Sequence, residues 1–181
     1  QADNVLGVDN TTGGTSYQPY ISANNPSIVN EAKFSYVSAK NERNTARAMI
    51  SVLTPSSAKT TIEDAMAEVQ KALTLMTTLL SNVNNALANT VPGGALTQAI
   101  LDGLKTTIQA SRTTITGQYT SIVTAKQSID NAKNSLTTYQ IAYDKAVRAL
   151  DQVKASSEST IKIRQAAYDQ AVATLAGKVN R

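Results

Sequence analysis

The side chains that could perform acid–base chemistry in this sequence are a few scattered carboxylates. Glu63 and Asp64 are adjacent, and Asp64 and Glu68 are four residues apart, which would place them on one face of a helix. Thr60 and Glu63 have the spacing of a capping box, in which both side chains bind the first turn of a helix. Capping by Glu63 and hydration of the other acids account for these residues, so we expect the chain not to be an enzyme.

Cysteine, histidine and tryptophan are all absent from the 181 residues. Histidine is the usual general base, and Cys and His supply most ligands of zinc, haem and iron–sulfur centres. Gly93 and Gly94 do not have the setting of a phosphate-binding loop, because no strand is expected before them and no Gly-Lys-Ser/Thr follows. We therefore expect no catalytic residues, no metal ligands and no cofactor.

The basic residues are spread singly along the chain. Lys and Arg number 17 against 13 Asp and Glu, which gives a net charge of +4. A nucleic-acid site needs basic residues gathered on one face, so we expect no nucleic-acid partner. Opposite charges three residues apart, such as Glu68 with Lys71 and Asp130 with Lys133, suit ion pairs on the surface of a helix.

The strongest pattern in the sequence is a heptad repeat between Leu101 and Val153. Apolar residues recur there at alternating intervals of three and four, and only Ser111 and Gln118 interrupt the apolar series. Such a repeat is typical of a long helix that buries one narrow stripe against other helices. The repeat consists of Leu101, Leu104, Ile108, Ser111, Ile115, Gln118, Ile122, Ala125, Ile129, Ala132, Leu136, Tyr139, Tyr143, Ala146, Leu150 and Val153.

The two polar members of the repeat are the candidate functional positions. Polar residues in a heptad core often fix the register or the number of partner helices. We therefore assign Ser111 and Gln118 as candidate interaction or register positions, with a ligand pocket between helices as the alternative. Tyr139, Tyr143 and Tyr168 have the spacing of core residues, so we expect them to be buried.

The other segments follow from the same kind of pattern. Residues 1–26 are predicted to be an extended, irregular lead-in, because Pro19, Pro26 and the turn-forming stretch 10–16 disfavour a continuous helix. Residues 27–181 are predicted to be an elongated helical bundle, with helices near 27–53, 60–89, 96–154 and 158–179. The expected fold class is therefore all-α, an elongated antiparallel bundle or coiled-coil hairpin. The polar stretch 155–159 is either a hairpin tip or a stutter within one helix.

The composition also indicates where in the cell the protein is located. No run of about 18 apolar residues occurs, so no membrane span is expected in this chain. Polar positions are mostly Thr, Ser, Asn and Gln, which together with the absence of Cys suits an exported bacterial protein. Gln1 is preceded by no initiator Met or signal peptide, which indicates a processed or excised form. We expect an extracytoplasmic location, in the periplasm or at the cell surface.

Several stretches resemble one protein family. Thr97–Ile108 and Ser121–Leu136 resemble the helical hairpin of bacterial periplasmic adaptor proteins, also called membrane fusion proteins. Ala142–Asp151 and Gln165–Leu175 are similar to the alanine-spaced helix that returns to the lipoyl-like domain of these adaptors, and Asn24-Asn25-Pro26 is similar to a stretch of longer adaptors. Because the lipoyl-like and β-barrel domains have no counterpart in the sequence, the resemblance implies the hairpin region alone and carries over no docking residues.

Three functions follow from these observations. The resemblance implies a non-catalytic rod that bridges an inner-membrane exporter and an outer channel, with the channel or transporter component and copies of the chain itself as protein partners. The first alternative is an extracytoplasmic four-helix sensor domain that binds a small molecule near Ser111 and Gln118. The second is a subunit of a bacterial surface filament or layer, because flagellins are similarly rich in Thr, Ser, Asn, Ala and Gln.

Overall fold

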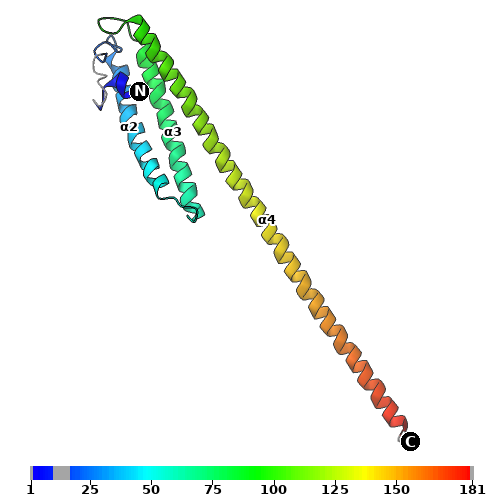
Figure 1. Ribbon diagram of the computed structural model, residues 1–181. Helices are drawn as coiled ribbons and strands as arrows, with labels where there is room; N and C mark the ends of the chain where they lie inside the picture. Colours follow the sequence, from blue (N-terminus) through cyan, green and yellow to red (C-terminus); the bar gives the residue numbers. More distant parts are fainter. Residues whose placement is uncertain (1, 10–16, 180–181) are drawn as a thin grey trace. The chain divides into compact units, whose positions relative to one another are not determined.

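The computed structural model describes residues 2–9 and 17–179. This part of the chain contains four helices: α1 (Ala2–Leu6), α2 (Pro26–Ser51), α3 (Lys59–Ala88) and α4 (Gln98–Val179) (Figure 1). Within these described residues the only β-type pairing is an isolated bridge between Gly93 and Leu96. The predicted all-α fold, a helical bundle or hairpin, is therefore confirmed.

The chain divides into two units, Gln1–Ser128 and Ile129–Arg181. Unit 1 contains α1, α2, α3 and the first part of α4, and unit 2 contains the remainder of α4. The core of the protein lies in unit 1, where side chains of all four helices form one apolar cluster. Unit 2 consists of a single helical segment, so its side chains have no second element to pack against within the described residues.

The lead-in that we expected at residues 1–26 is partly helical. Ala2–Leu6 forms α1, whose Val5 and Leu6 are 1% exposed and belong to the core cluster. Ile21 is equally well buried and belongs to the same cluster. The prediction of an extended segment is wrong for residues 2–6, because one helical turn is enough to place Val5 and Leu6 together in the core. The predicted turn at 10–16 lies outside the described residues.

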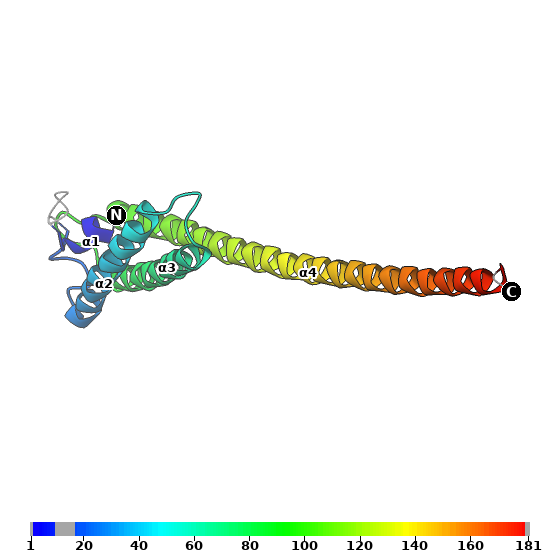
Figure 2. The same cartoon turned by 90° about the horizontal axis from the view of Figure 1, so that it is seen from below.

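Helices α2 and α3 pack against each other as an antiparallel pair joined by residues 52–58 (Figures 1 and 2). The sequence of α2 is polar between Ser38 and Thr45, yet an alanine is buried every seven residues, at Ala32, Ala39 and Ala46. Helix α3 buries Ala65 and Ala72 at the same interval. Alanine has a short side chain that lets two helix backbones approach closely, so this pair is held by small residues.

The capping box predicted at Thr60–Glu63 is not formed. Helix α3 begins at Lys59, and its N-cap residue Ala58 makes no side-chain cap. The Glu63 carboxylate instead lies 3.8 Å from Lys59 Nζ, one turn earlier in the same helix. Glu63 therefore supports the first turn by an ion pair along the surface of the helix.

The loop between α3 and α4 is held by hydrogen bonds. Gly93 and Leu96 exchange two backbone hydrogen bonds of 3.0 Å, and Gly94 between them adopts φ +57°. Thr90 Oγ1 accepts a hydrogen bond from Ser22 N at 2.9 Å and donates one to the Ala86 carbonyl at 2.7 Å. Since Thr90 and Ser22 are both buried, this hydroxyl ties the N-terminal segment to the end of α3.

Helix α4 runs without a break from Gln98 to Val179, through residues 155–159. The two helices predicted near 96–154 and 158–179 are therefore one helix, and the polar stretch between them is a stutter. No Pro or Gly occurs in this stretch, so nothing in its backbone requires the helix to end. The apolar repeat changes register there, since Val153 is followed by Ser157 and then Ile161 at intervals of four.

Hydroxyl side chains cover much of the polar surface of α4. Their Oγ atoms donate to the carbonyl oxygen four residues earlier, so each is satisfied within its own helix. These donors are Thr106, Ser111, Thr113, Thr114, Thr120, Ser121, Ser128, Thr137, Thr138, Thr160 and Thr174.

Candidate interaction surface

The first part of the heptad repeat is covered by the core of unit 1. Leu101 and Ile108 are 1% exposed, and Leu104 and Ile115 pack against the core cluster at its edge. Their neighbours in this cluster include the α3 residues Leu79, Leu80 and Val83. Leu101 and Ile108 are seven residues apart and so occupy the same heptad position. The apolar face that the repeat predicted is therefore buried in this part of α4.

The two candidate positions of the repeat lie in different surroundings. Ser111 is half-buried, and its Oγ donates to the Thr107 carbonyl at 2.9 Å. Gln118, two helical turns further along α4, is exposed. The structure therefore does not bring Ser111 and Gln118 into one site, and only Ser111 borders a groove.

The groove beside Ser111 lies between α4 and the other helices of unit 1 and has a volume of about 760 Å³. Its surface is largely apolar; Arg43 from α2 and Asp3 from α1 supply its charged groups, and Tyr36 and several hydroxyl residues of α4 supply its other polar groups. A concave apolar surface with a few polar groups is the usual form of a small-molecule site. The lining residues are Ala2, Asp3, Tyr36, Arg43, Met76, Leu79, Leu80, Thr106, Thr107, Ala110, Ser111, Thr114 and Ile115.

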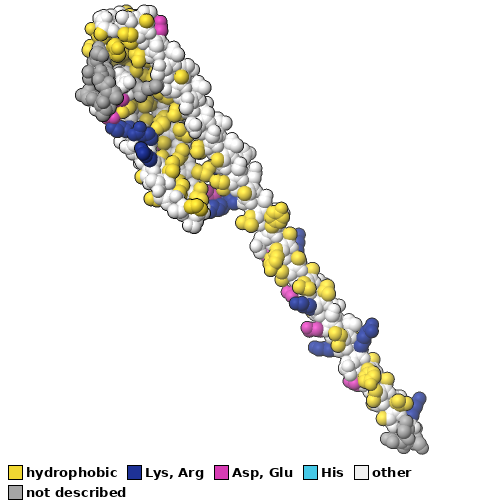
Figure 3. Space-filling view, in the orientation of Figure 1, with side chains coloured by type: hydrophobic (Ala, Val, Ile, Leu, Met, Phe, Trp, Pro, Cys, Tyr) yellow, Lys and Arg dark blue, Asp and Glu magenta, His cyan; other side chains and the backbone are white. Residues whose placement is uncertain are grey.

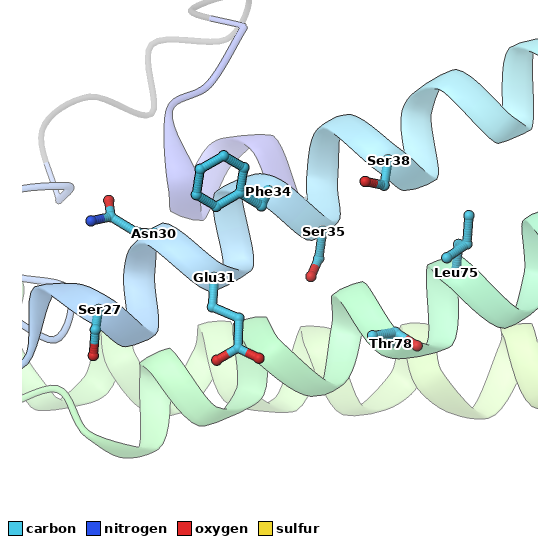
Figure 4. Close-up of a pocket in the computed structure, with 8 residues that line it drawn as sticks. All are labelled: Ser27, Asn30, Glu31, Phe34, Ser35, Ser38, Leu75 and Thr78. Atoms are coloured by element: carbon cyan, nitrogen blue, oxygen red, sulfur yellow. The ribbon is translucent and has the colours of Figure 1, made fainter.

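A smaller groove, with a volume of about 490 Å³, runs between α2 and α3 (Figure 4). Ser27, Glu31 and Ser38 line it from α2, and Leu75 and Thr78 line it from α3. Phe34 stands at its edge with 76% of its surface exposed, an unusual position for the only Phe of the chain. The sequence pointed to Glu31 only as a solvated acid and not to Phe34, because a lone aromatic residue in a polar segment has no periodic pattern.

In unit 2 the heptad repeat of α4 is exposed (Figure 3). Leu136, Tyr139 and Tyr143 are 65–73% exposed, and Leu150 and Val153 are more than half exposed. We call residues 129–153 of this repeat the α4 stripe. Large apolar side chains at heptad spacing normally lie in the interface of a coiled coil. The α4 stripe therefore has the pattern of a helix–helix interface and the exposure of a free surface.

The expectation that Tyr139, Tyr143 and Tyr168 are buried is wrong for this chain. Their side chains are 73%, 65% and 65% exposed. The spacing correctly assigned them to the apolar face of a helix, but spacing alone cannot say whether another helix covers that face. Beyond the stutter a second short series, Ile161, Tyr168, Val172 and Leu175, is likewise exposed.

A first polar cluster joins the N-terminal segment to α2. Tyr36 OH and Lys40 Nζ both donate to Asp9 Oδ2, at 2.5 and 2.7 Å. The hydrogen bond from Lys40, followed by that from Tyr36, lowers the pKa of the Asp9 carboxyl below its ordinary value. Burial and the bond to Asp9 raise the pKa of Tyr36. Sequence reasoning missed this cluster, since Asp9 and Lys40 are 31 residues apart.

A second polar cluster lies between α2 and α3. Lys71 Nζ is 2.6 Å from Glu42 Oε1 and 3.5 Å from Glu68 Oε1. Hydrogen bonds from Glu68 and then Lys71 lower the pKa of Glu42, whereas the bond to Glu42, together with burial, raises the pKa of Glu68. Glu42 therefore ionises more readily than Glu68 beside the Lys71 ammonium group. The pair of Glu68 with Lys71 was predicted from their spacing, but Glu42 was not assigned to it.

Neither a cluster of metal-binding side chains nor a membrane-spanning helix occurs among the described residues. Among residues 2–9 and 17–179, no group of three acidic side chains is placed to hold a metal ion. No helix in the described part of the chain is long and apolar enough to cross a membrane. No family model, curated protein or solved structure matches this chain.

Proposed function

We propose that this chain is a non-catalytic helical segment of a bacterial periplasmic adaptor, which links an inner-membrane exporter to an outer channel. The single observation that supports this proposal most strongly is the apolar face of α4 in unit 2. A helix of 82 residues that leaves large apolar side chains exposed at regular intervals is suited to binding other helices.

The resemblance of stretches of α4 to the helices of adaptor hairpins supports the same proposal, although α4 itself makes no reversal and the proposal takes it as one continuous helix. The stretches that carry it, from Thr97 to Leu175, all fall on α4 apart from the short turn before it. In such a role, unit 1 is a folded base whose core is complete, and unit 2 is the segment that contacts partner proteins. The proposed location is the bacterial periplasm, and the work of the chain is to bridge proteins, without a chemical step.

The proposal can be tested with a photo-crosslinking amino acid placed at Tyr168 in the native bacterium. Tyr168 is exposed and belongs to the apolar face beyond the stutter. The matched control is Gln170, also exposed and roughly 200° around the helix from Tyr168 at about 100° per residue. We expect crosslinks from position 168, identified by mass spectrometry as exporter or channel subunits, and far fewer from position 170.

Two results would contradict the adaptor role. One is crosslinking from position 168 to proteins that belong to no exporter or channel. The other is protection of the chain from a protease that is admitted to the periplasm by permeabilising the outer membrane. A periplasmic adaptor must be cleaved in that treatment, whereas a cytoplasmic protein must not.

A small-molecule sensor is the second candidate, favoured by the groove beside Ser111. The Arg43 guanidinium at its rim suits a ligand with a carboxylate, since Arg can bind a carboxylate through two parallel hydrogen bonds. A panel of amino acids and organic acids can be screened by thermal unfolding. A sensor requires one ligand that raises the Tm of the native chain and not that of the Arg43→Ala variant. A flat screen would leave this candidate without support.

A further inference from the structure

The α4 stripe has an uneven distribution of side-chain sizes. One series of heptad positions carries large residues, namely Ile129, Leu136, Tyr143 and Leu150. The alternate series carries Ala132, Tyr139, Ala146 and Val153, of which two are the smallest apolar side chain available. A partner helix must place small residues opposite the large ones to fill the space between the backbones, because helix interfaces are packed as densely as protein cores.

We propose that the α4 stripe pairs with the same segment of a second copy of the chain in an antiparallel coiled coil centred near residue 141. In an antiparallel pair, each large-series position of one helix lies opposite a small-series position of the other. With this centre, Leu136 meets Ala146 of the second copy and Leu150 meets Ala132. Ile129 meets Val153 at the ends, and Tyr143 meets Tyr139 in the middle. The proposal goes beyond the adaptor role, since it rests only on side chains of unit 2.

A parallel pair of the same segments is poorly matched. In a parallel, in-register dimer each residue lies opposite its own copy, so alanines meet alanines at positions 132 and 146. Tyrosines meet tyrosines in two consecutive layers in either arrangement, so they do not distinguish the two. The alanine layers do: each leaves a void in the parallel pair, whereas in the antiparallel pair Ala132 and Ala146 are matched by Leu150 and Leu136, so the side-chain sizes favour the antiparallel arrangement.

The residues that flank the α4 stripe are compatible with this arrangement. On one side they are small and uncharged: Ser135 would lie near Ala149 of the second copy, and Ala142 near its own equivalent. On the other side Lys133 would lie near Val147, which its aliphatic stem can cover. Because no two like charges face each other between residues 129 and 153, self-pairing meets no electrostatic penalty along the stripe.

The molecule already contains a helix pair of this type. Helices α2 and α3 are antiparallel, and each buries alanines seven residues apart, such as Ala39 and Ala46 on α2 and Ala65 and Ala72 on α3. Along the heptad repeat of α4, Ala125 just before the α4 stripe and Ala132 within it are also seven residues apart, and 14 residues separate Ala132 from Ala146. Close antiparallel packing through alanine is therefore a mode that this chain demonstrably uses.

The absence of cysteine from the chain provides a direct test by disulfide formation. Single-cysteine variants of the full chain are oxidised under mild conditions and analysed on non-reducing gels. We expect Ala142→Cys to form a disulfide-linked dimer alone. Ser135→Cys and Ala149→Cys should each give little dimer alone, but a mixed dimer when the two are combined.

Sedimentation velocity over a concentration series gives the second readout. We expect the unmodified chain to double in mass with rising concentration, and Tyr143→Lys to remain monomeric with unchanged helical content. Tyr143 is 65% exposed, so this substitution does not disturb a core. The matched control Thr138→Lys, at an exposed position away from the stripe, should dimerise like the parent chain.

Three outcomes would overturn the proposal. A strong Ala132→Cys homodimer would show parallel pairing, because Ala132 is a core position that meets its own copy only in a parallel pair. A chain that stays monomeric at all concentrations would show that the α4 stripe does not bind a second copy of itself. Continuous growth in mass would show an open-ended assembly. Because none of these readouts involves an exporter or channel, their result is independent of the crosslinking test of the adaptor role.

Discussion

Two leucines on α4 allow a matched test of which part of the apolar repeat stabilises the fold. Leu101 and Leu136 are 35 residues apart and so occupy the same heptad position five repeats apart. Leu101 is 1% exposed within the core of unit 1, whereas Leu136 is 70% exposed in unit 2. Replacing each by alanine removes the same three carbon atoms from the same kind of helix, so the two variants differ only in environment.

The expected magnitudes follow from burial. Removing three buried carbon atoms at Leu101 costs about 2.4 kcal/mol at about 0.8 kcal/mol per carbon. The cavity that remains raises the total to about 3–4 kcal/mol, within the usual range for such substitutions. For Leu136→Ala we expect a change within about 0.5 kcal/mol, as at other surface positions.

Urea unfolding followed by circular dichroism measures both variants, at a concentration low enough for the chain to be monomeric. With a slope of about 2 kcal/mol per M, Leu101→Ala should lower the midpoint of the main transition by about 1.5–2 M. Leu136→Ala should leave this midpoint nearly unchanged. Equal losses for the two variants would refute the reasoning, because they would mean that unit 2 is covered in the monomer.

Three further predictions concern unit 1. Thr90→Val should destabilise the chain by about 1–3 kcal/mol in thermal unfolding, since it leaves the buried Ser22 N–H without an acceptor, whereas Thr90→Ser should behave like the parent. Gly94→Ala should lower the free energy of unfolding by at least about 1–2 kcal/mol, because alanine is strained at φ +57° and its Cβ would meet a tyrosine hydroxyl. Gly103→Ala should be neutral or stabilising, because the space around Gly103 is open. The raised pKa of Glu68 should make the stability of the parent chain decline as the pH rises above about 4.5 toward neutrality, and Glu68→Gln should flatten this decline. Urea unfolding at several pH values measures it.

The sign of the last prediction follows from proton binding. The folded chain holds a proton on Glu68 more tightly than the unfolded chain does, because its pKa is raised by the bond to Glu42 and by burial. The stabilisation is thus complete below the ordinary value of 4.5 and is lost as the pH rises through the folded pKa. The pKa of Glu42 is lowered, so its own contribution is lost only in more acidic solution. A steeper pH dependence in Glu68→Gln would contradict this assignment.

The sequence was sufficient to predict most of the helical residues, though not α1 or the continuity of α4, and it did not show what covers the helices. The heptad spacing correctly assigned Leu101 and Ile108 to a buried face, and the same spacing placed Tyr139 and Tyr143 on a face that the structure leaves exposed. A heptad repeat shows that one face of a helix is apolar. It does not show whether a second helix covers that face, because this depends on the three-dimensional fold. Continuity of α4 through residues 155–159 was also undecided, because small polar residues are compatible with both a helix and a turn.

The features missed from the sequence share a physical cause. Ala39 is 2% exposed in a segment that is otherwise polar, and its only signal was the interval of seven residues from Ala32 and Ala46. Asp9 with Lys40, and Glu42 with Lys71, are pairs made by packing between elements. Local spacing can predict Glu68 with Lys71 on one helix, but a pair across two helices requires knowledge of their register. Of the two candidate positions, only Ser111 borders a groove.

The hydroxyl-covered surface of α4 has a consequence for the medium in which this helix can operate. A helix that is stabilised by interactions between exposed charges loses part of that stabilisation in salt, because salt screens the charges over a Debye length of about 8 Å at physiological ionic strength. Serine and threonine hydroxyls bonded to their own backbone carry no charge to screen and no proton to lose near neutrality. The helical content of α4 between Thr106 and Ser128, where seven of these hydroxyls lie and only Arg112 and Lys126 are charged, should therefore vary little across brackish, fresh or mildly acidic surroundings. Such tolerance would suit a protein whose surroundings follow the external medium.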